Sequence, residues 1–317
     1  MATSGTVTYS VNELDIMTDA METIGCKDPL DALRAEDVVT CRRKLNMIIK
    51  QWTANIDFAP GLKLWTRRKG YVFLQKDQTV YSLGPSGDNA TESYVDISLA
   101  ANGAALAGSV TVSSAASLST AMYMGVLLDT GAFHWTTING APAGAVVTLT
   151  TALPSAAASG NKVYAYTTKL RRPFEIVTCV RRDTSGNDTP VDPQLSVQEY
   201  EAIPDKSTNG SVAGLYFEAA RTNAKIYTDC APDDATDVLR MTYLSYIEDF
   251  SAANDDVDLP AEWFRPLSAQ LAFDLCPVFQ VSVPTGLPLI LKESLAMAKN
   301  AYPENSTASY QSCPDDY

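Results

Sequence analysis

The chain has 317 residues, of which 46% are hydrophobic and 19% charged, and its formal net charge is −13. These values are typical of a soluble globular protein with a sizeable core, and so acidic a chain argues against a general nucleic-acid-binding surface, which would be basic. No apolar run approaches the ~20 residues of a membrane span, and the first residues do not follow the pattern of a secretory signal. The six cysteines are widely spaced without a CxxC pair, which favours free thiols in a reducing cytoplasm.

Residues 10–56 predict two helices. Ser10 and Glu13 fit a capping box that starts the first helix, and Gly25 suits a left-handed turn that ends it. In both helices apolar residues recur at helical spacing, so each helix has one apolar face that should pack against another element. The apolar positions are Leu14, Met17, Met21 and Ile24 in the first helix, and Val38, Cys41, Leu45, Ile48, Trp52 and Ile56 in the second.

Strands are predicted for the middle of the chain. The runs "LKLWT", "GYVFLQ" and "TVYSLG" in residues 62–84 are rich in β-forming residues. Residues 85–168 carry few charges and many Ala, Gly, Ser and Thr residues, and their short alternating runs are separated by turn residues. This pattern predicts an inserted antiparallel β-sandwich or barrel domain. Residues 169–257 return to mixed strands, with one helical turn capped by Ser196 and Glu199.

Two further helices are predicted after the acidic linker "SAANDDVD". The first should begin at Asp258 or Pro260 and stop at Pro277. Neither helical pair is long enough to be stable alone, which predicts one bundle built from both chain termini. The expected inward positions are Trp263, Leu267, Leu271 and Leu275 in the first helix, and Leu287, Leu291, Leu295 and Ala298 in the second.

The predicted fold is therefore α+β, with the helical bundle and mixed strand segments around the inserted β domain. Its five parts are the N-terminal helices and first strands (1–84), the inserted domain (85–168), a β-rich core segment (169–257), the C-terminal helices (258–301) and a polar tail (302–317). The tail has no periodicity, so alone it cannot bury enough surface to order itself.

Few residues suggest catalysis. The sequence has one histidine, His134, so no histidine cluster can form. His134 lies on a predicted strand at an exposed position, which does not favour a catalytic role. No phosphate-binding or dinucleotide-binding glycine motif is present, and we expect no cofactor. The acidic stretches "PDDATD" and "DFSAANDDVD" could supply paired carboxylates for a metal or for acid–base chemistry, but solvated loops are the commoner interpretation. We expect the protein not to be an enzyme.

Basic pairs are conspicuous in so acidic a chain. Arg42 and Arg43 lie on the second predicted helix, and Arg67 and Arg68 precede a predicted strand. They are candidates for contacts to an acidic partner subunit or to passing DNA phosphates, with ordinary surface charge as the alternative.

Three segments, in order, resemble the head-to-tail adaptors of short-tailed bacteriophages, a family also called tail accessory factors, packaged-DNA stabilisation proteins or tail tubular protein A. They cover about two thirds of the chain; the block 85–168 is outside the minimal family pattern. The matching residues are Leu45, Asn46, Trp52, Leu64, Trp65, Phe73, Leu74, Tyr81, Leu83 and Gly84 in the first segment, Ser196, Glu199, Tyr200, Pro204, Lys206 and Gly210 in the second, and Leu259, Pro260, Glu262, Trp263, Leu267 and Leu271 in the third.

The resemblance implies a virion protein of the phage neck, assembled in the host bacterial cytoplasm. It implies a ring of identical subunits, twelve-fold in the family, that bridges the portal protein and the tail nozzle or tail tube protein. Packaged DNA would be retained by the ring and pass through its lumen without sequence-specific contacts. It implies no active site. With this role, the tail 302–317 becomes a candidate portal-docking segment with Tyr302, Tyr310 and Tyr317 as anchors.

Two alternatives remain open at the level of sequence. The chain could be a different neck or tail structural protein that carries an adhesin-like β decoration domain. It could also be a tail-associated glycan hydrolase that uses the acidic pairs, which would require a deep cleft with convergent carboxylates.

Overall fold

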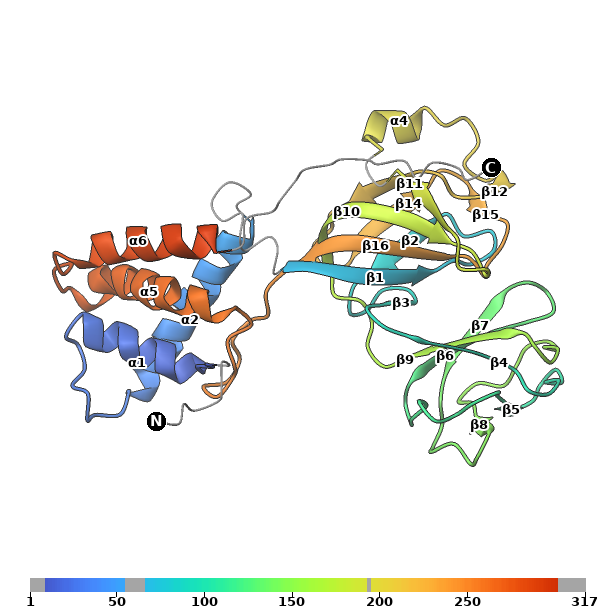
Figure 1. Cartoon of the computed structure of the whole chain (residues 1–317), viewed down its shortest axis with the longest axis horizontal. Helices are drawn as coiled ribbons and strands as arrows, with labels where there is room; N and C mark the ends of the chain where they lie inside the picture. Colours follow the sequence, from blue (N-terminus) through green and yellow to red (C-terminus); the bar gives the residue numbers. More distant parts are fainter. Residues whose placement is uncertain (1–8, 55–65, 193–194, 302–317) are drawn as a thin grey trace, which may run out of the picture. The chain divides into compact units, whose positions relative to one another are not determined.

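The structure is a computed structural model that describes residues 9–54, 66–192 and 195–301 (Figure 1). The fold is mixed α+β, as the sequence predicts, and the sheets are mainly antiparallel. The chain divides into two compact units. We call Met1–Thr66 together with Ile247–Tyr317 the helical unit, and Arg67–Tyr246 the β unit.

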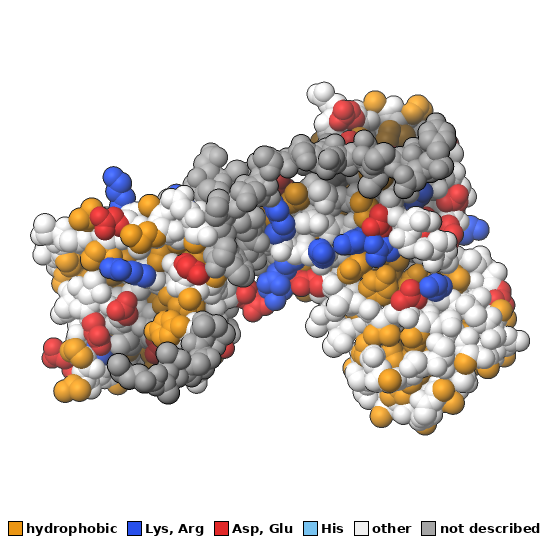
Figure 2. Space-filling view, in the orientation of Figure 1, with side chains coloured by type: hydrophobic (Ala, Val, Ile, Leu, Met, Phe, Trp, Pro, Cys, Tyr) orange, Lys and Arg blue, Asp and Glu red, His pale blue; other side chains and the backbone are white. Residues whose placement is uncertain are grey.

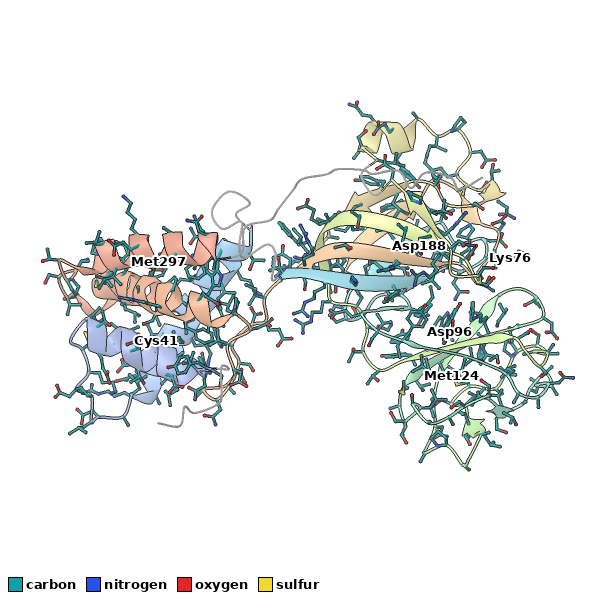
Figure 3. The ribbon with its side chains drawn as sticks, viewed as in Figure 1. Cys41, Lys76, Asp96, Met124, Asp188 and Met297 are labelled. Carbon is teal, nitrogen blue, oxygen red and sulfur yellow. The ribbon has the colours of Figure 1, made fainter. Side chains whose placement is uncertain are left out.

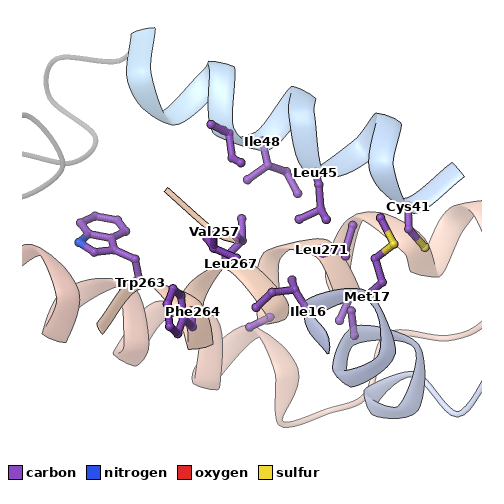
Figure 4. Close-up of a cluster of buried hydrophobic side chains, with 14 of the residues drawn as sticks. Ile16, Met17, Cys41, Leu45, Ile48, Val257, Trp263, Phe264, Leu267 and Leu271 are labelled. Carbon is purple, nitrogen blue, oxygen red and sulfur yellow. The ribbon is translucent and has the colours of Figure 1, made fainter. Parts of the chain in front are cut away.

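The helical unit contains helices from both ends of the sequence around one hydrophobic core (Figure 4). Helix α5 contacts α1, α2 and α6, and the predicted inward residues Trp263, Leu267, Leu271 and Leu275 are fully buried. On α6, Leu287 and Ala298 are buried while Leu291 and Leu295 are half-buried against the same core. The helices of this unit are α1 (Glu13–Thr23), α2 (Ala35–Ala54), the short 3-10 helix η1 (Ala261–Trp263), α5 (Phe264–Phe279) and α6 (Leu287–Asn300).

The start of α1 differs from the predicted capping box. Asn12, not Ser10, is the cap: its side chain accepts a hydrogen bond from the Asp15 N–H at 2.9 Å, and the Asp15 carboxylate accepts one from the Asn12 N–H at 3.1 Å. Glu13 instead begins the helix with a fully buried side chain. At the other end Gly25 has φ +72°, so the predicted left-handed turn is confirmed.

The prediction that Pro277 stops α5 is wrong. The helix continues to Phe279 and ends at Gln280, whose φ of +56° is left-handed. A proline lacks the N–H that would bond the carbonyl four residues earlier, here that of Phe273. The Phe273 side chain is 38% exposed, so water can reach this part of the helix, and the proline is tolerated in the last turn.

The β unit has a core between two antiparallel sheets. Residues of the five-stranded sheet β11-β10-β16-β1-β3 and of the three-stranded sheet β13-β14-β2 share one buried cluster. A two-residue pair, β12 (Asn209–Gly210) with β15 (Ala231–Pro232), is parallel. The strands of the five-stranded and three-stranded sheets are β1 (Arg67–Phe73), β2 (Val80–Leu83), β3 (Ala90–Thr91), β10 (Pro173–Arg182), β11 (Asp188–Val191), β13 (Leu215–Glu218), β14 (Ala224–Thr228) and β16 (Val238–Ser245).

The predicted helical turn in this unit is confirmed. Helix α4 (Val197–Glu201) begins at Ser196, whose hydroxyl accepts a hydrogen bond from the Glu199 N–H, and the Glu199 carboxylate accepts one from the Ser196 N–H. This reciprocal arrangement is the capping box that the sequence indicates.

Residues 95–166, which we call the insert, form a four-stranded sheet in the order β4-β9-β6-β7 and a two-stranded sheet of β5 and β8. Side chains from both sheets share one core, and the alternating runs that the sequence predicts as strands are strands. No sheet closes among the described residues, so the barrel alternative is wrong. The strands are β4 (Val95–Ser98), β5 (Ser109–Thr111), β6 (Tyr123–Leu127), β7 (Phe133–Thr137), β8 (Val146–Thr148) and β9 (Lys162–Tyr166).

An aromatic cluster joins the insert to the five-stranded sheet. Phe73 of β1 lies at its centre: its ring centroid is 5.0 Å from that of Tyr164, 5.0 Å from that of Trp135 and 5.2 Å from that of Tyr94. The Tyr164 hydroxyl donates to the Thr236 carbonyl at 3.1 Å. We call this cluster the aromatic junction; its rings are those of Phe73, Tyr94, Tyr123, Phe133, Trp135, Tyr164 and Tyr166.

Candidate functional site

Arg42 is engaged inside the helical unit. Its Nε donates to the Glu13 carboxylate oxygens at 2.8 and 3.1 Å, and its Nη2 donates to Oε2 at 2.8 Å. The Glu13 side chain is 0% exposed and that of Arg42 26% exposed. The hydrogen bond to Glu13 raises the pKa of Arg42. This forked pair joins α1 to α2, and it compensates the Arg42 charge within the fold.

Arg43, the next residue of α2, is exposed. Because consecutive residues of a helix are turned by about 100°, Arg43 cannot share the environment of Arg42. The sequence pairs the two arginines, but the fold separates their roles: Arg42 holds two helices together and Arg43 presents its side chain at the surface.

Arg67 and Arg68 begin β1, where alternate side chains point to opposite faces of the sheet. Arg68 lies beside Glu92, with 3.6 Å between the Nη1 atom and the carboxylate, and Arg171 approaches the same carboxylate to 3.7 Å. The Tyr243 hydroxyl donates to Glu92 at 2.9 Å, and burial, followed by the Glu92 charge, raises the Tyr243 pKa. Arg68 therefore belongs to a polar network on the core side of β1.

Arg67 is exposed on the other face, the one turned away from the buried cluster of the β unit. The strand register places Lys69 beside it on β1 and Arg240 further along on β16, and Arg182 of β10 faces the same way. Figure 2 shows Lys and Arg side chains gathered where these strands lie in Figure 1. We call Arg67, Lys69, Arg182 and Arg240 the basic face.

Asp188 compensates part of the basic face (Figure 3). Arg182 binds it through two hydrogen bonds of 2.7 Å, and Arg240 Nη1 lies 3.3 Å from the same carboxylate. The hydrogen bonds from Arg182 hold the pKa of Asp188 below its usual range. One carboxylate thus serves two guanidinium groups, so the face retains a positive balance there.

The acidic stretches are used in turns. Asp255 accepts hydrogen bonds from the N–H groups of Ser251 and Ala252, which hold its pKa below the usual range. Asp234 accepts from the Thr236 N–H and hydroxyl. Within the part of the chain that the structure describes, no group of three His, Cys, Asp or Glu side chains is arranged to hold a metal ion.

His134 is half-buried on β7, slightly less open than the exposed position that the sequence predicts. Its Nε2 lies 3.3 Å from both the carbonyl and the hydroxyl oxygen of Thr151. The Thr151 hydroxyl donates to the Thr136 hydroxyl at 2.8 Å, so its proton is directed away from the His134 ring.

The outer side of the helical unit presents apolar side chains. Met297 of α6 is 71% exposed and Leu289 59% exposed. A groove of ≈ 340 Å³ runs beside Met297 and Ile290, with the charged side chains of Arg265 and Glu293 in its lining (Met297 is labelled in Figure 3). Exposed apolar side chains beside a groove are typical of surfaces that contact another protein.

The aromatic junction is the feature that sequence reasoning missed. Its signal is present in the alternation of "FHW" and "YAY": Phe133 with Trp135, and Tyr164 with Tyr166, each occupy one face of their strand. The alternation predicts which residues share a face of each strand. It does not predict that Phe73 of β1 packs against that face.

Several residues of the sequence-based analysis lie outside the described residues. They are Ile56 of the second predicted helix, Leu64 and Trp65 of the first segment, and the candidate anchors Tyr302, Tyr310 and Tyr317.

No protein-family model matches this sequence, and a search of the curated proteins finds no significant match. None of the described helices is both long enough and apolar enough to cross a membrane.

Proposed function

We propose that this chain is the head-to-tail adaptor of a short-tailed bacteriophage, a structural protein that forms a ring under the portal. The ring joins head to tail, retains packaged DNA and lets it pass during ejection. The observation that carries the proposal is the ordered resemblance of three segments to that family. Trp52 of the first segment packs against Trp263 of the third, with ring centroids 5.6 Å apart, so these two matching segments belong to one core in this chain.

The matching residues act mainly through the fold. Leu45, Tyr81 and Leu267 are at most 1% exposed, and Ser196 with Glu199 caps a helix. A resemblance in core and capping residues indicates a shared fold rather than a shared reaction. A shared fold without a shared reaction is consistent with a structural role. In this proposal the helices from both termini form one bundle that makes the ring wall.

Charge supports passage of DNA without tight binding. The net charge of −13 gives an assembled ring a strongly acidic character, which would repel the DNA backbone. Arg43, Arg67 and Lys69 are exposed cations that could meet an acidic neighbour or passing phosphates, whereas Arg182 and Arg240 are half-buried and bound to Asp188. Arg42 is the weakest candidate for that role because a buried carboxylate already binds it.

Ring formation needs a surface on which copies meet, and we propose the apolar outer side of α6 for it. The groove beside Met297 combines apolar walls with Arg265 and Glu293, so a neighbouring copy could find both apolar contact and opposite charge. The portal and the tail nozzle or tail tube protein would occupy other surfaces. The insert, outside the family pattern, would decorate the assembly or contact a further partner.

The test is electron microscopy and mass determination of the purified full chain, alone and with the portal of the same phage. The expected result is a closed ring, twelve-fold if the family pattern holds, that binds the portal. Met297→Asp should abolish rings but leave a folded monomer. Leu30→Asp, at a side chain that is 99% exposed, is the matched control and should assemble normally. A wild-type protein that stays monomeric and does not bind the portal would contradict the proposal.

Truncation after Asn300 tests the tail as a portal latch. The truncated protein should still form rings but fail to join DNA-filled heads. Attachment with unchanged affinity would refute docking by the tail and leave the ring proposal intact.

A further inference from the structure

A second concave surface lies at the edge of the insert, within the β unit. The cavity has a volume of ≈ 310 Å³, at the lower end of the range for small-molecule sites. Its floor belongs to β6 and β7 of the four-stranded sheet, and Asn89, from the loop before β3, contributes to it from the other side. The lining residues are Asn89, Tyr123, Trp135, Thr136, Thr137, Thr150 and Thr151.

Two half-buried aromatic rings line this cavity. The Tyr123 ring is stacked on Tyr166 with centroids 4.9 Å apart and an angle of 19° between the planes. The Trp135 ring lies over Gly125 of the neighbouring strand, where an added Cβ would come within 2.8 Å of three ring carbons. Both rings are therefore fixed before a ligand arrives, so a ligand that packs on them costs no side-chain ordering there.

Hydroxyl and amide groups surround the rings. The hydroxyls of Thr137 and Thr150 lie 2.8 Å apart, and since only one of them donates in that bond, the other keeps its hydrogen for a ligand. The Asn89 amide oxygen accepts from the Tyr166 hydroxyl at 2.8 Å, which orients its NH₂ group. These groups both donate and accept, as neutral hydroxyl ligands require.

No lining residue of this cavity carries a formal charge. The Lys169 Nζ lies 5.3 Å from the Tyr123 ring centroid and donates to the Gly87 carbonyl. An anionic ligand such as a phosphate would find no guanidinium to bind it, so the chemistry favours an uncharged ligand with one apolar face.

We propose that this cavity binds a neutral saccharide. One pyranose ring would place its C–H face against Tyr123 and Trp135, and its hydroxyls would exchange hydrogen bonds with Thr137, Thr150 and Asn89. This binding activity is separate from ring assembly, because none of these side chains belongs to the helical unit.

The test uses saturation-transfer NMR on the full chain with the methyl glycosides of glucose, galactose, mannose, rhamnose and N-acetylglucosamine. At least one should receive saturation, most strongly at the C–H protons of one ring face. Thr137→Val and Thr150→Val keep the side-chain shape and should each weaken binding about tenfold, as expected for one lost hydrogen bond. Thr178→Val, at an exposed position of β10, is the matched control and should bind like the wild type.

Saturation of none of the five glycosides overturns the proposal, as does equal binding by the wild type and both pocket variants. An octaproline peptide is the competing probe, because aromatic-lined grooves also bind proline-rich segments. Binding of that peptide without binding of any sugar would assign the cavity to a protein partner and refute the saccharide site.

Discussion

Arg42 and Arg43 show at the scale of single residues how far a charge pattern can be interpreted. Both arginines stand out in an acidic sequence, and helical periodicity separates them onto different sides of α2. Periodicity does not reveal that Glu13, distant in sequence, supplies a fully buried carboxylate to one of them. Which carboxylate binds Arg42 depends on how α1 packs against α2. The residue pattern of either helix alone does not predict that packing.

Arg42→Ala should lower the free energy of unfolding by about 3 kcal/mol, because it leaves the Glu13 carboxylate buried without its partner. Arg43→Ala, at the exposed neighbour, should change it by less than about 0.5 kcal/mol. Urea denaturation of both variants measures the difference. The double variant Arg42→Met with Glu13→Leu should recover most of the loss, since it removes both charges. Equal stability of the two single variants would show that the pair is not structurally required.

We expect the buried thiols to lower the free energy of unfolding as the pH rises above about 9. Burial raises the pKa of Cys41 to about 11 and that of Cys179 to about 12. Their stabilising effect is complete below the unfolded-state pKa of about 9 and is lost as pH rises towards the folded values, because the unfolded chain releases these protons first. In that window each group should contribute a decline of up to about 1.4 kcal/mol per pH unit.

The measurement is the free energy of unfolding of the wild type and of Cys41→Ala between pH 8 and about 11. The variant should be less stable at pH 8, because it loses buried volume, and its decline with pH should be shallower. Parallel curves would contradict the assignment of part of the decline to Cys41.

At the scale of elements, apolar periodicity was the reliable signal. The stripe from Trp263 to Leu275 is fully buried, and the alternating runs of the insert are strands. End signals were less reliable, since two capping patterns overlap near Asn12 and only the geometry of the turn selects between them. Pro277 was misleading because a proline in a final turn removes a single hydrogen bond, and other contacts of α5 outweigh it.

Trp52→Ala should destabilise the helical unit by about 3–5 kcal/mol, because a large buried side chain that packs on Trp263 leaves a cavity. Met47→Ala on the same helix is the control; its side chain is 61% exposed, so the effect should stay below about 0.5 kcal/mol. Chemical denaturation, followed by far-ultraviolet circular dichroism, measures both. A loss below about 1 kcal/mol for Trp52→Ala would show that this contact carries little of the stability.

At the scale of the whole molecule, composition identified residues 85–168 as a distinct block, but not how it is attached. β3 pairs with β1, so part of the block belongs to the five-stranded sheet. Rings of the insert, including Phe133, Tyr164 and Tyr166, then cover Phe73 and Val238 of that sheet. This attachment depends on a contact between the insert and the five-stranded sheet. The sequence of either part alone shows which of its side chains are apolar, but not which surface of the other part they contact.

Two deletions test this attachment. Joining Gly84 directly to Lys169 removes β3 and uncovers Phe73, so this variant should unfold or aggregate. A shorter deletion that joins Glu92 to Lys169 through two glycines keeps β3 and the carboxylate beside Arg68 and Tyr243. The Thr91 hydroxyl donates to the Thr168 carbonyl at 2.8 Å, so the ends lie close together. With Phe73→Ser and Val238→Thr added, it should fold and still form rings.

Thermal unfolding and electron microscopy of both variants decide between the outcomes. A stable, ring-forming product of the longer deletion would show that neither β3 nor the junction is needed by the rest of the β unit.

The strand register places the first and last strands of the insert next to each other, and does the same for the first and last strands of the β unit. Val95 pairs with Ala165 at the entrance to the insert, and Arg67 pairs with Leu244 at the entrance to the β unit. Closing a loop as long as Arg67–Tyr246 before it is ordered costs roughly 3 kcal/mol more than closing a few residues. The architecture therefore favours an inside-out order of folding, in which the insert forms first and the helices from the two ends of the chain meet last. In pulsed hydrogen exchange during refolding, amides of β6 and β9 should gain protection before those of α1 and α5, and the reverse order would rule this sequence of events out.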